Sequence, residues 1–262
     1  MEILLQGISV FLLVFCRMTA FFVVAPIFSS RGVPNIFKVG LSAMIALLIV
    51  IIQGFNQAIP TDLNYLLLVV RELLIGLLMG YVAQLLFTVI QMAGSFIDIQ
   101  MGFGIVNVID PMTGASAPVL GNFKYIIATL LFLSMNGHHY LLDAVIRSYN
   151  WMPLSNELFQ RIYHGTLSEF LVRTFSQAFL LSFQLAAPLV VALFITDVAL
   201  GFLARTAPQF NVFVIGIPLK IMVGLAMLLL LIPSLIYAFE NLFQVLFKSL
   251  HNLFGTIGQR PT

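Results

Sequence analysis

Charged residues are scarce in this chain of 262 residues: they make up 8% of it, whereas 61% of the residues are hydrophobic. Soluble domains carry about 25% charged residues, so this composition cannot supply a surface that faces water. The mean hydropathy is +1.07. These values predict an integral membrane protein, and the small net charge of +2 indicates no nucleic-acid partner.

Cysteine occurs once, as Cys16, which excludes an intramolecular disulfide and a cysteine-based metal cluster. No nucleophile motif, phosphate-binding loop or dinucleotide fingerprint is present. His139 and Asp143 have the i,i+4 spacing of a helical metal site, but a third ligand is not apparent. We therefore expect no enzyme activity, no cofactor and no metal.

Six apolar blocks are separated by more polar linkers, at about 3–28, 38–52, 66–90, 123–135, 175–204 and 212–239. A membrane-spanning helix needs about 20 residues, and the second and fourth blocks are shorter than that. Short blocks beside Gly- and Pro-rich segments favour discontinuous or re-entrant helices. Helices buried by neighbouring subunits and a plain six-helix bundle with irregular ends are the alternatives. The first block lacks a basic leading region, so we expect a retained membrane segment rather than a cleaved signal peptide.

The segment 100–121, QMGFGIVNVIDPMTGASAPVLG, combines four glycines and two prolines with an apolar composition. Because Gly and Pro disfavour helix interiors, we expect no long helix there. Asp110 is its only ionisable residue. Irregular backbone at membrane depth is tolerated only where it is buried in protein or lines a cavity. The segment is therefore predicted to line, plug or seal a cavity inside a membrane assembly.

Seven charged residues lie in or beside the apolar blocks: Arg17, Arg71, Glu72, Asp98, Asp197, Arg205 and Lys220. A charge at membrane depth costs about 2.5 kcal/mol or more, so each should face protein or water. We expect contacts between helices and subunits, with a water-filled path or a proton relay as the alternative. Arg71 and Glu72 are neighbours on a helix, and they are not expected to face each other.

The linker 136–173 is the only long stretch of ordinary soluble composition, and we expect it to form short helices outside the hydrocarbon core. The last block ends in an amphipathic helix. Its broad apolar face comprises Phe239, Leu242, Phe243, Leu246, Phe247, Leu250 and Phe254. Such a face is typical of a helix that lies at an interface or packs against a partner helix.

Five stretches, in this order, resemble the FliR/SctT family of type III export-gate proteins, and the overall match favours its flagellar members. They read FCRMTAFFVVAPIF, VPNIFKVGLS, AGSFIDIQMGFGIVNVIDPMTG, FLSMNGHHYLLDAVIRSY and QLAAPLVVALFITDVALGFLARTAPQFNVFVIGIPLK. Each stretch alone is a weak signal, but the ordered set covers essentially the whole chain.

The resemblance implies a FliP-like helical part over 1–174, which contains the loop 100–121, and a FliQ-like helical hairpin over 175–262. It also implies a hetero-oligomeric gate in which one copy of this chain joins several FliP and FliQ homologues. FlhB, FlhA, unfolded flagellar export substrates and membrane lipid are the further partners. The implied location is the bacterial inner membrane, within the flagellar basal body.

On this resemblance the chain is a pore subunit through which unfolded flagellar subunits pass. The expected plug residues are Gly102, Phe103, Gly104, Ile105, Val106, Asn107, Val108, Ile109, Asp110, Pro111, Met112 and Gly114. Glycines allow the loop to bend, and a ring of apolar side chains blocks ions by dewetting. Packing of this loop between subunits is the alternative.

A secondary transporter or small channel that moves a solute by itself is the competing function. Broken helices and intramembrane charges fit that class as well. Transporters often show internal symmetry, which this chain does not. A structural scaffold of the assembly is a third possibility.

Overall fold

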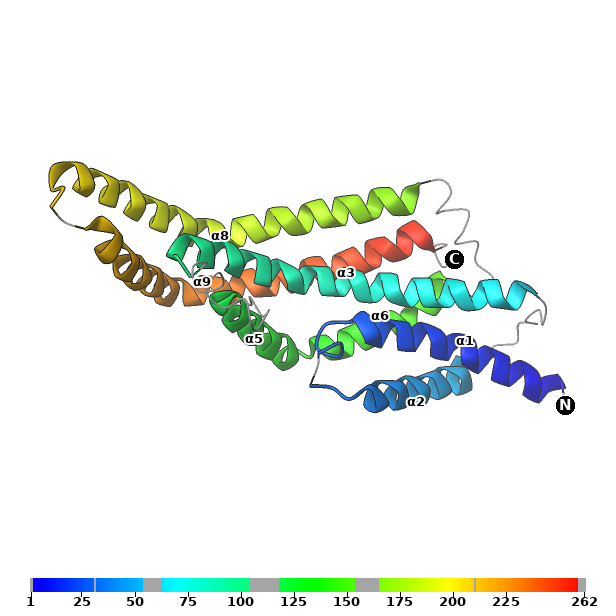
Figure 1. The fold of residues 1–262 in the computed structure, drawn as a ribbon. Coiled ribbons are helices and arrows are strands. Elements are labelled where there is room, and N and C mark those ends of the chain that lie inside the picture. Colours follow the sequence, from blue (N-terminus) through cyan, green and yellow to red (C-terminus); the bar gives the residue numbers. More distant parts are fainter. Residues whose placement is uncertain are drawn as a thin grey trace. The chain divides into compact units, whose positions relative to one another are not determined.

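The computed structural model describes residues 2–30, 32–53, 63–103, 118–153, 165–209 and 211–258, and every regular element within these ranges is an α-helix. The elements, drawn in Figure 1, are α1 (Glu2–Val24), α2 (Asn35–Gln53), α3 (Leu63–Met101), α5 (Val119–Ser134), α6 (Gly137–Trp151), α8 (Thr166–Thr206) and α9 (Val212–Ile257). Five of them are long and apolar enough to cross a membrane, and α5 with α6 forms a sixth candidate span. The predicted fold class, an all-α integral membrane protein, is confirmed.

The fourth apolar block belongs to a broken helix. Helix α5 ends at Ser134 and α6 begins at Gly137, so the helical path is interrupted between them. Asn136 occupies the break with a left-handed backbone (φ 57°), a region that Asn tolerates better than most residues do. This agrees with the predicted discontinuity. The prediction that the second block is too short to span is wrong, because α2 begins three residues earlier, at Asn35.

The described residues of the linker 136–173 form one short helix and the start of a long one. The first part of the linker is α6, which ends at Trp151, and residues 154–164 lie outside the described ranges. From Thr166 onward the linker belongs to α8, a helix of 41 residues that continues through Pro188. The expectation of short helices is therefore wrong for residues 166–173, because the helix continues unbroken into the apolar block.

Two compact units are built from parts that are distant in the chain. The first unit comprises Met1–Leu85, Asn136–Thr174 and Val245–Thr262, and the second comprises Leu86–Met135 and Phe175–Gln244. Helices α3, α8 and α9 contribute residues to both units. The division into a FliP-like and a FliQ-like part concerns likeness to other families, and it stays a prediction.

Two glycines one turn apart allow α1 to approach α3 closely in the first unit. A Cβ atom on Gly76 would overlap the carbonyl oxygen of Arg17, and one on Gly80 would lie 3.0 Å from the carbonyl oxygen of Phe21. Helix α1 also packs against α2, and the two lie side by side (Figure 1). Small residues at a helix contact let the backbones meet, which is a common way of packing helices in membranes.

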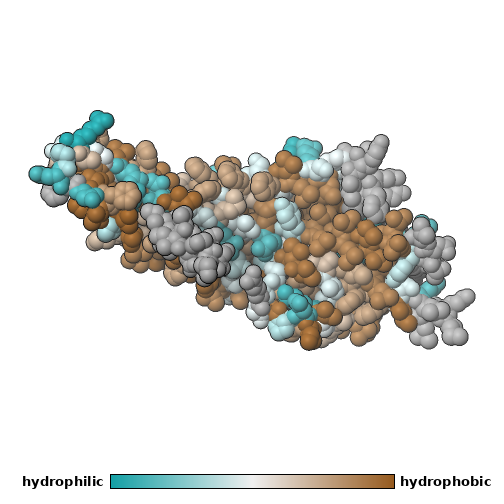
Figure 2. Space-filling model, in the orientation of Figure 1, coloured by the Kyte–Doolittle hydropathy of each residue, from teal (hydrophilic) through white to brown (hydrophobic). Residues whose placement is uncertain are grey.

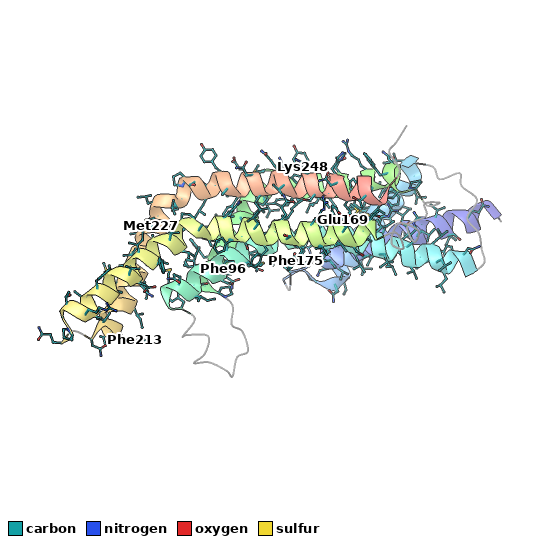
Figure 3. The ribbon with its side chains drawn as sticks, turned by 90° about the horizontal axis from the view of Figure 1, so that it is seen from above. Phe96, Glu169, Phe175, Phe213, Met227 and Lys248 are labelled. Carbon is teal, nitrogen blue, oxygen red and sulfur yellow. The ribbon has the colours of Figure 1, made fainter. Side chains whose placement is uncertain are left out.

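The core of the second unit joins four helices. Its buried residues are Ala93, Ile97 and Met101 from α3, Leu120 from α5, Ala186, Leu189 and Leu193 from α8, and Leu228 from α9. Phe96 points from α3 toward α8 (Figure 3), where its ring meets Phe179 and Phe183 edge-on at 6.2 Å between centroids. Phe213 is labelled in the same view at the start of α9, beside the turn that joins it to α8.

The apolar face of the C-terminal helix is buried by helices of the same chain. Phe239, Leu242, Phe243, Leu246, Leu250 and Phe254 are all buried. In the second unit Phe243 stacks on Phe87 and meets Phe132 edge-on. In the first unit the ring of Phe247 lies 5.4 Å from that of Tyr140. The partner helices expected for this face are therefore supplied by the chain itself.

Many large apolar side chains nevertheless remain exposed on the single chain. Ile36 is 87% exposed and Phe213 is 74% exposed. Hydrophobic residues cover much of the described surface that is visible in Figure 2. Apolar surface of this extent requires lipid or neighbouring subunits to cover it.

Replacing Gly76 by alanine should destabilise the first unit by about 1–3 kcal/mol, because the added methyl group overlaps the backbone of α1. Gly40→Ala is the matched control, since a Cβ there meets nothing within 4 Å and alanine favours a helix. Thermal unfolding in detergent, followed by the fluorescence of Trp151, gives the comparison. Equal midpoints for the two variants would contradict the close approach of α1 and α3.

Candidate functional site

Of the segment 100–121, which contains the predicted plug, the structure describes only the two ends. Gly102 and Phe103 follow α3, and Pro118 precedes α5. The remaining plug residues lie outside the described ranges: Gly104, Ile105, Val106, Asn107, Val108, Ile109, Asp110, Pro111, Met112 and Gly114. The site that can be built from described atoms is therefore the root of the loop, where α3 ends and α5 begins.

Helix α3 continues past the end of its apolar block at Ile90 and stops at Met101. Gly102 then adopts a left-handed backbone (φ 90°), which glycine reaches without steric cost. The amide of Phe103 donates to the carbonyl oxygen of Asp98 at 2.9 Å, and this bond closes the end of the helix. The sequence signal for this boundary is the glycine itself.

The start of α5 is held by a side chain from α3. Both carboxylate oxygens of Asp98 lie 3.2 Å from the amide nitrogen of Leu120, and one lies 3.5 Å from that of Gly121. Pro118, at the N-cap position, makes no side-chain hydrogen bond to the helix. Asp98 is therefore the cap of a helix that begins more than twenty residues later in the chain.

Two glycines make this approach possible. A Cβ atom on Gly94 would overlap the backbone of Gly121, and one on Gly121 would lie 3.1 Å from the carbonyl oxygen of Gln91. Lys124, one turn further along α5, is 1% exposed. Its ammonium group has no hydrogen-bond partner among the described residues, and its charge acts on Asp98. Sequence reasoning missed Lys124, although a lone cation at the edge of an apolar block signals it.

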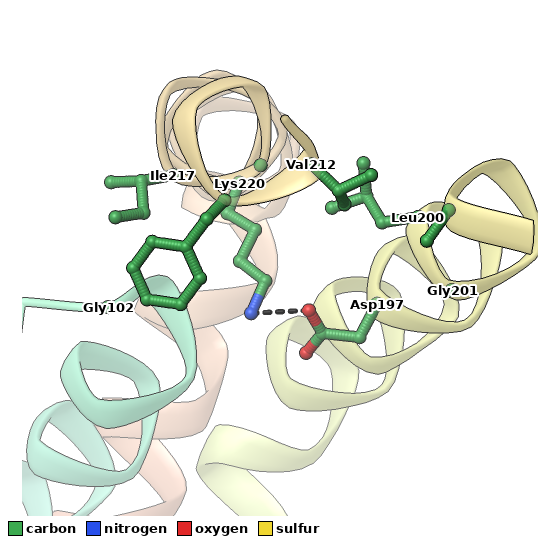
Figure 4. Close-up of a pocket in the computed structure, with 10 residues that line it drawn as sticks. Gly102, Asp197, Leu200, Gly201, Val212, Ile217 and Lys220 are labelled. Carbon is green, nitrogen blue, oxygen red and sulfur yellow. Dashed lines mark ion pairs between the residues drawn. The ribbon is translucent and has the colours of Figure 1, made fainter. Parts of the chain in front are cut away.

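The last turn of α3 is also bonded to the hairpin of α8 and α9. The side-chain amide of Gln100 donates to Asp197 at 2.8 Å, and Asp197 forms an ion pair with Lys220 (Figure 4). The pair lines a cavity of about 360 Å³ whose other walls are largely apolar, among them Leu200, Val212 and Ile217. Gly102 lines the same cavity. Arg205, in contrast, lies exposed in the last turn of α8 and joins none of these contacts among the described residues.

A second group of charges is buried in the first unit. The guanidinium group of Arg17 on α1 binds both carboxylate oxygens of Glu72 on α3, at 2.6 and 3.0 Å. It also donates to Ser148 at 2.9 Å and to the carbonyl oxygen of Met152 at 3.0 Å. Bidentate pairing with a carboxylate is the strongest form of this contact. One cation thereby connects α1, α3 and the end of α6.

Arg71 joins the same group. Its guanidinium group lies 3.1 Å from Glu72 and also donates to the carbonyl oxygen of Pro153. The expectation that these two neighbours do not face each other is wrong, because the long arginine side chain reaches back to the carboxylate. Tyr149 places its ring 3.8 Å from the guanidinium carbon of Arg17, which adds a cation–π contact. Ser148 and Tyr149 were not found from the sequence.

Four described charged residues of the linker, Asp143, Arg147, Glu169 and Arg173, are exposed and pair with neighbours on their own helix. Asp143 and Arg147 form an exposed i,i+4 pair at 2.7 Å. The rings of His138 and His139 lie 4.2 Å apart. Among the described residues, no group of three or more His, Cys, Asp or Glu side chains is placed to hold a metal.

Glu72→Gln should lower the free energy of unfolding by about 3–5 kcal/mol, because it leaves two buried guanidinium groups without their carboxylate. Arg147→Gln is the control, since an exposed helical pair is worth about 0.3–0.5 kcal/mol. Thermal unfolding in detergent and the amount of protein in the membrane fraction test both variants. Similar losses for the two variants would show that burial of the Arg17–Glu72 pair has no energetic consequence.

Reversing one charge of the Asp197–Lys220 pair should destabilise the hairpin by about 1.5–3 kcal/mol, the usual worth of a charge-assisted hydrogen bond. Exchanging both residues, as Asp197→Lys with Lys220→Asp, should restore most of the loss because the attraction returns. The unfolding midpoints of the two single variants and the double variant form the test. A double variant as unstable as the sum of the singles would contradict a direct pair.

The fold and the paired internal charges define a polytopic helical membrane protein. Residues 8–246 match the family described as bacterial export proteins, family 1. The chain is 40% identical over 248 residues to the flagellar biosynthetic protein FliR of Bacillus subtilis, covering 95% of each chain. It is 33% identical over 241 residues to the flagellar biosynthetic protein FliR of Escherichia coli, covering 92% of this chain and 91% of the relative. The chain therefore belongs to the FliR family of bacterial export proteins, as the five stretches predict.

Proposed function

We propose that this chain is a gate subunit of the flagellar type III export apparatus, which forms the export channel with FliP and FliQ homologues and helps to seal it. Its further partners are FlhB, FlhA and unfolded flagellar export substrates. It acts without catalysis or a cofactor, and its place is the inner membrane within the flagellar basal body. Membership in the FliR family supports this assignment.

The root of the loop is the observation that carries the sealing role. Two helices are fastened to each other at the point where the chain enters and leaves the segment 104–117. That segment is apolar apart from Asp110 and a few small polar residues. An apolar segment presented from a fixed root suits a constriction that excludes ions by dewetting, and its glycines let it yield to a passing chain.

Helix length supports an assembly that extends beyond the bilayer. Helices α3, α8 and α9 contain 39, 41 and 46 residues. At about 1.5 Å per residue each is roughly 60–70 Å long, about twice the thickness of the hydrocarbon core. Their exposed apolar side chains then need protein neighbours wherever lipid is absent. FliP and FliQ homologues are the neighbours proposed.

Native mass spectrometry of the tagged chain, co-expressed with the FliP and FliQ homologues of the same organism, tests the assembly. We expect one discrete particle with a single copy of this chain and several copies of each partner. Recovery of the chain alone or as a homo-oligomer, with both partners present in the cell, would contradict the proposal and favour an independent transporter.

Deleting residues 106–114 should make the assembled gate leak ions, because the dewetted constriction is removed. Replacing the same residues with glycine and serine at unchanged length should leak as well, which separates loss of apolar side chains from loss of chain length. Arg147→Gln, on an exposed helix surface, is the control that should stay sealed. The measurement is ion conductance of the purified complex in liposomes. Unchanged conductance in an assembled deletion variant would rule out the seal.

A further inference from the structure

We infer that Asp98 is a positioning residue for the proposed seal: its carboxylate ties the first turn of α5 to the last turns of α3, so that both ends of the segment 104–117 are held as one rigid root. This inference rests on the proposed function for its consequence, and on the described contacts of the second unit for the tie itself.

The position of the carboxylate is that of a helix cap supplied from another helix. The amides of the second and third residues of a helix are the ones that a capping side chain binds, and Leu120 and Gly121 occupy these positions in α5. Pro118, at the cap position, has no side-chain oxygen to offer. A negative charge at a helix N-terminus is further stabilised by the helix dipole. Removing Asp98 therefore takes from α5 both its cap and its hydrogen bonds to α3.

Asp98 is 2% exposed, so water cannot replace the lost contact readily. Lys124, one turn further along α5, is buried as well. A buried polar group without a partner is costly, and the Asp98 carboxylate would become one if α5 moved away. The hydrogen bonds from Leu120 and Gly121 therefore favour a short distance between α3 and α5.

The root is in turn fixed to the hairpin of α8 and α9. The side chain of Met101 occupies the space left by Gly224, and Gln100 bonds to Asp197 beside the Asp197–Lys220 pair. Leu120, the residue that Asp98 holds, lies in the same buried core as Met101. The described residues on both sides of the segment 104–117 are therefore held by the same core.

One double variant distinguishes the role of Asp98 as a cap of α5 from its role in connecting α5 to α3. Asp98→Ala removes both, whereas Asp98→Ala with Pro118→Ser returns a local cap to α5 without reconnecting α3. Pro118 has the extended backbone of an N-cap (φ −59°, ψ 126°), which serine adopts readily. Asp98→Asn keeps an acceptor oxygen and is the conservative variant. Asp143→Ala, on an exposed surface, is the matched control.

The tie is measured on the full chain in detergent. Spin labels on Ile99→Cys and Phe123→Cys, two exposed positions that flank the contact, are introduced in a Cys16→Ser background. We expect strong dipolar broadening in the parent and in Asp143→Ala, weaker broadening in Asp98→Asn, and loss of broadening in Asp98→Ala. The loss should persist in the double variant although its thermal stability recovers. Recovery of broadening in the double variant would overturn the inference, because Asp98 would then be a cap only.

The consequence is measured as ion conductance of the assembled complex in liposomes. We expect the double variant to leak several-fold more than the parent, as the deletion of 106–114 does. A leaking deletion together with a sealed double variant would overturn the positioning role. A deletion variant that stays sealed would overturn the proposed seal instead. The spin-label measurement would then test only whether Asp98 connects α5 to α3.

Discussion

A carboxylate that is withdrawn from water must find its hydrogen-bond donors inside the protein, and the buried Glu72 and Asp98, together with the half-buried Asp197, organise this chain. Glu72 on α3 forms ion pairs with Arg17 on α1 and with its own neighbour Arg71. Asp98, also on α3, accepts hydrogen bonds from the first amides of α5. Asp197 on α8 forms an ion pair with Lys220 on α9 and accepts a hydrogen bond from Gln100 on α3. Because an unpaired buried charge is so costly, each of the two buried carboxylates specifies which helices must meet.

Glycine sets how closely those helices meet. Gly76 and Gly80 bring α3 against the backbone of α1, in the same unit as the Arg17–Glu72 pair. Gly94 and Gly121 do the same for α3 and α5 beside Asp98. Short side chains such as aspartate reach another helix only when the backbones are close. The small residues therefore bring the helix backbones close together, and the buried carboxylates form their hydrogen bonds across these close contacts.

Much of the fold could be predicted from hydropathy, because apolar blocks of sufficient length have no other stable arrangement in a membrane. The ends of the helices were harder to predict from hydropathy. Helix α3 runs on to Met101, eleven residues beyond its apolar block, since its last turns are buried against α8 and α9 rather than exposed to lipid. The apolar face at the end of α9 gave a correct signal of packing, but its pattern did not reveal that the partners belong to the same chain.

The sequence by itself determined the membrane class, the family, the breaks at Gly102 and Asn136, and the identity of the charges that need partners. These properties depend on composition and on residues next to each other in the chain. Only the tertiary structure decided which charges meet. Arg17 and Glu72 are 55 positions apart, and Asp98 and Leu120 are 22 apart. Such pairs depend on the distance between helices, which is set by packing over the whole unit and leaves no local pattern.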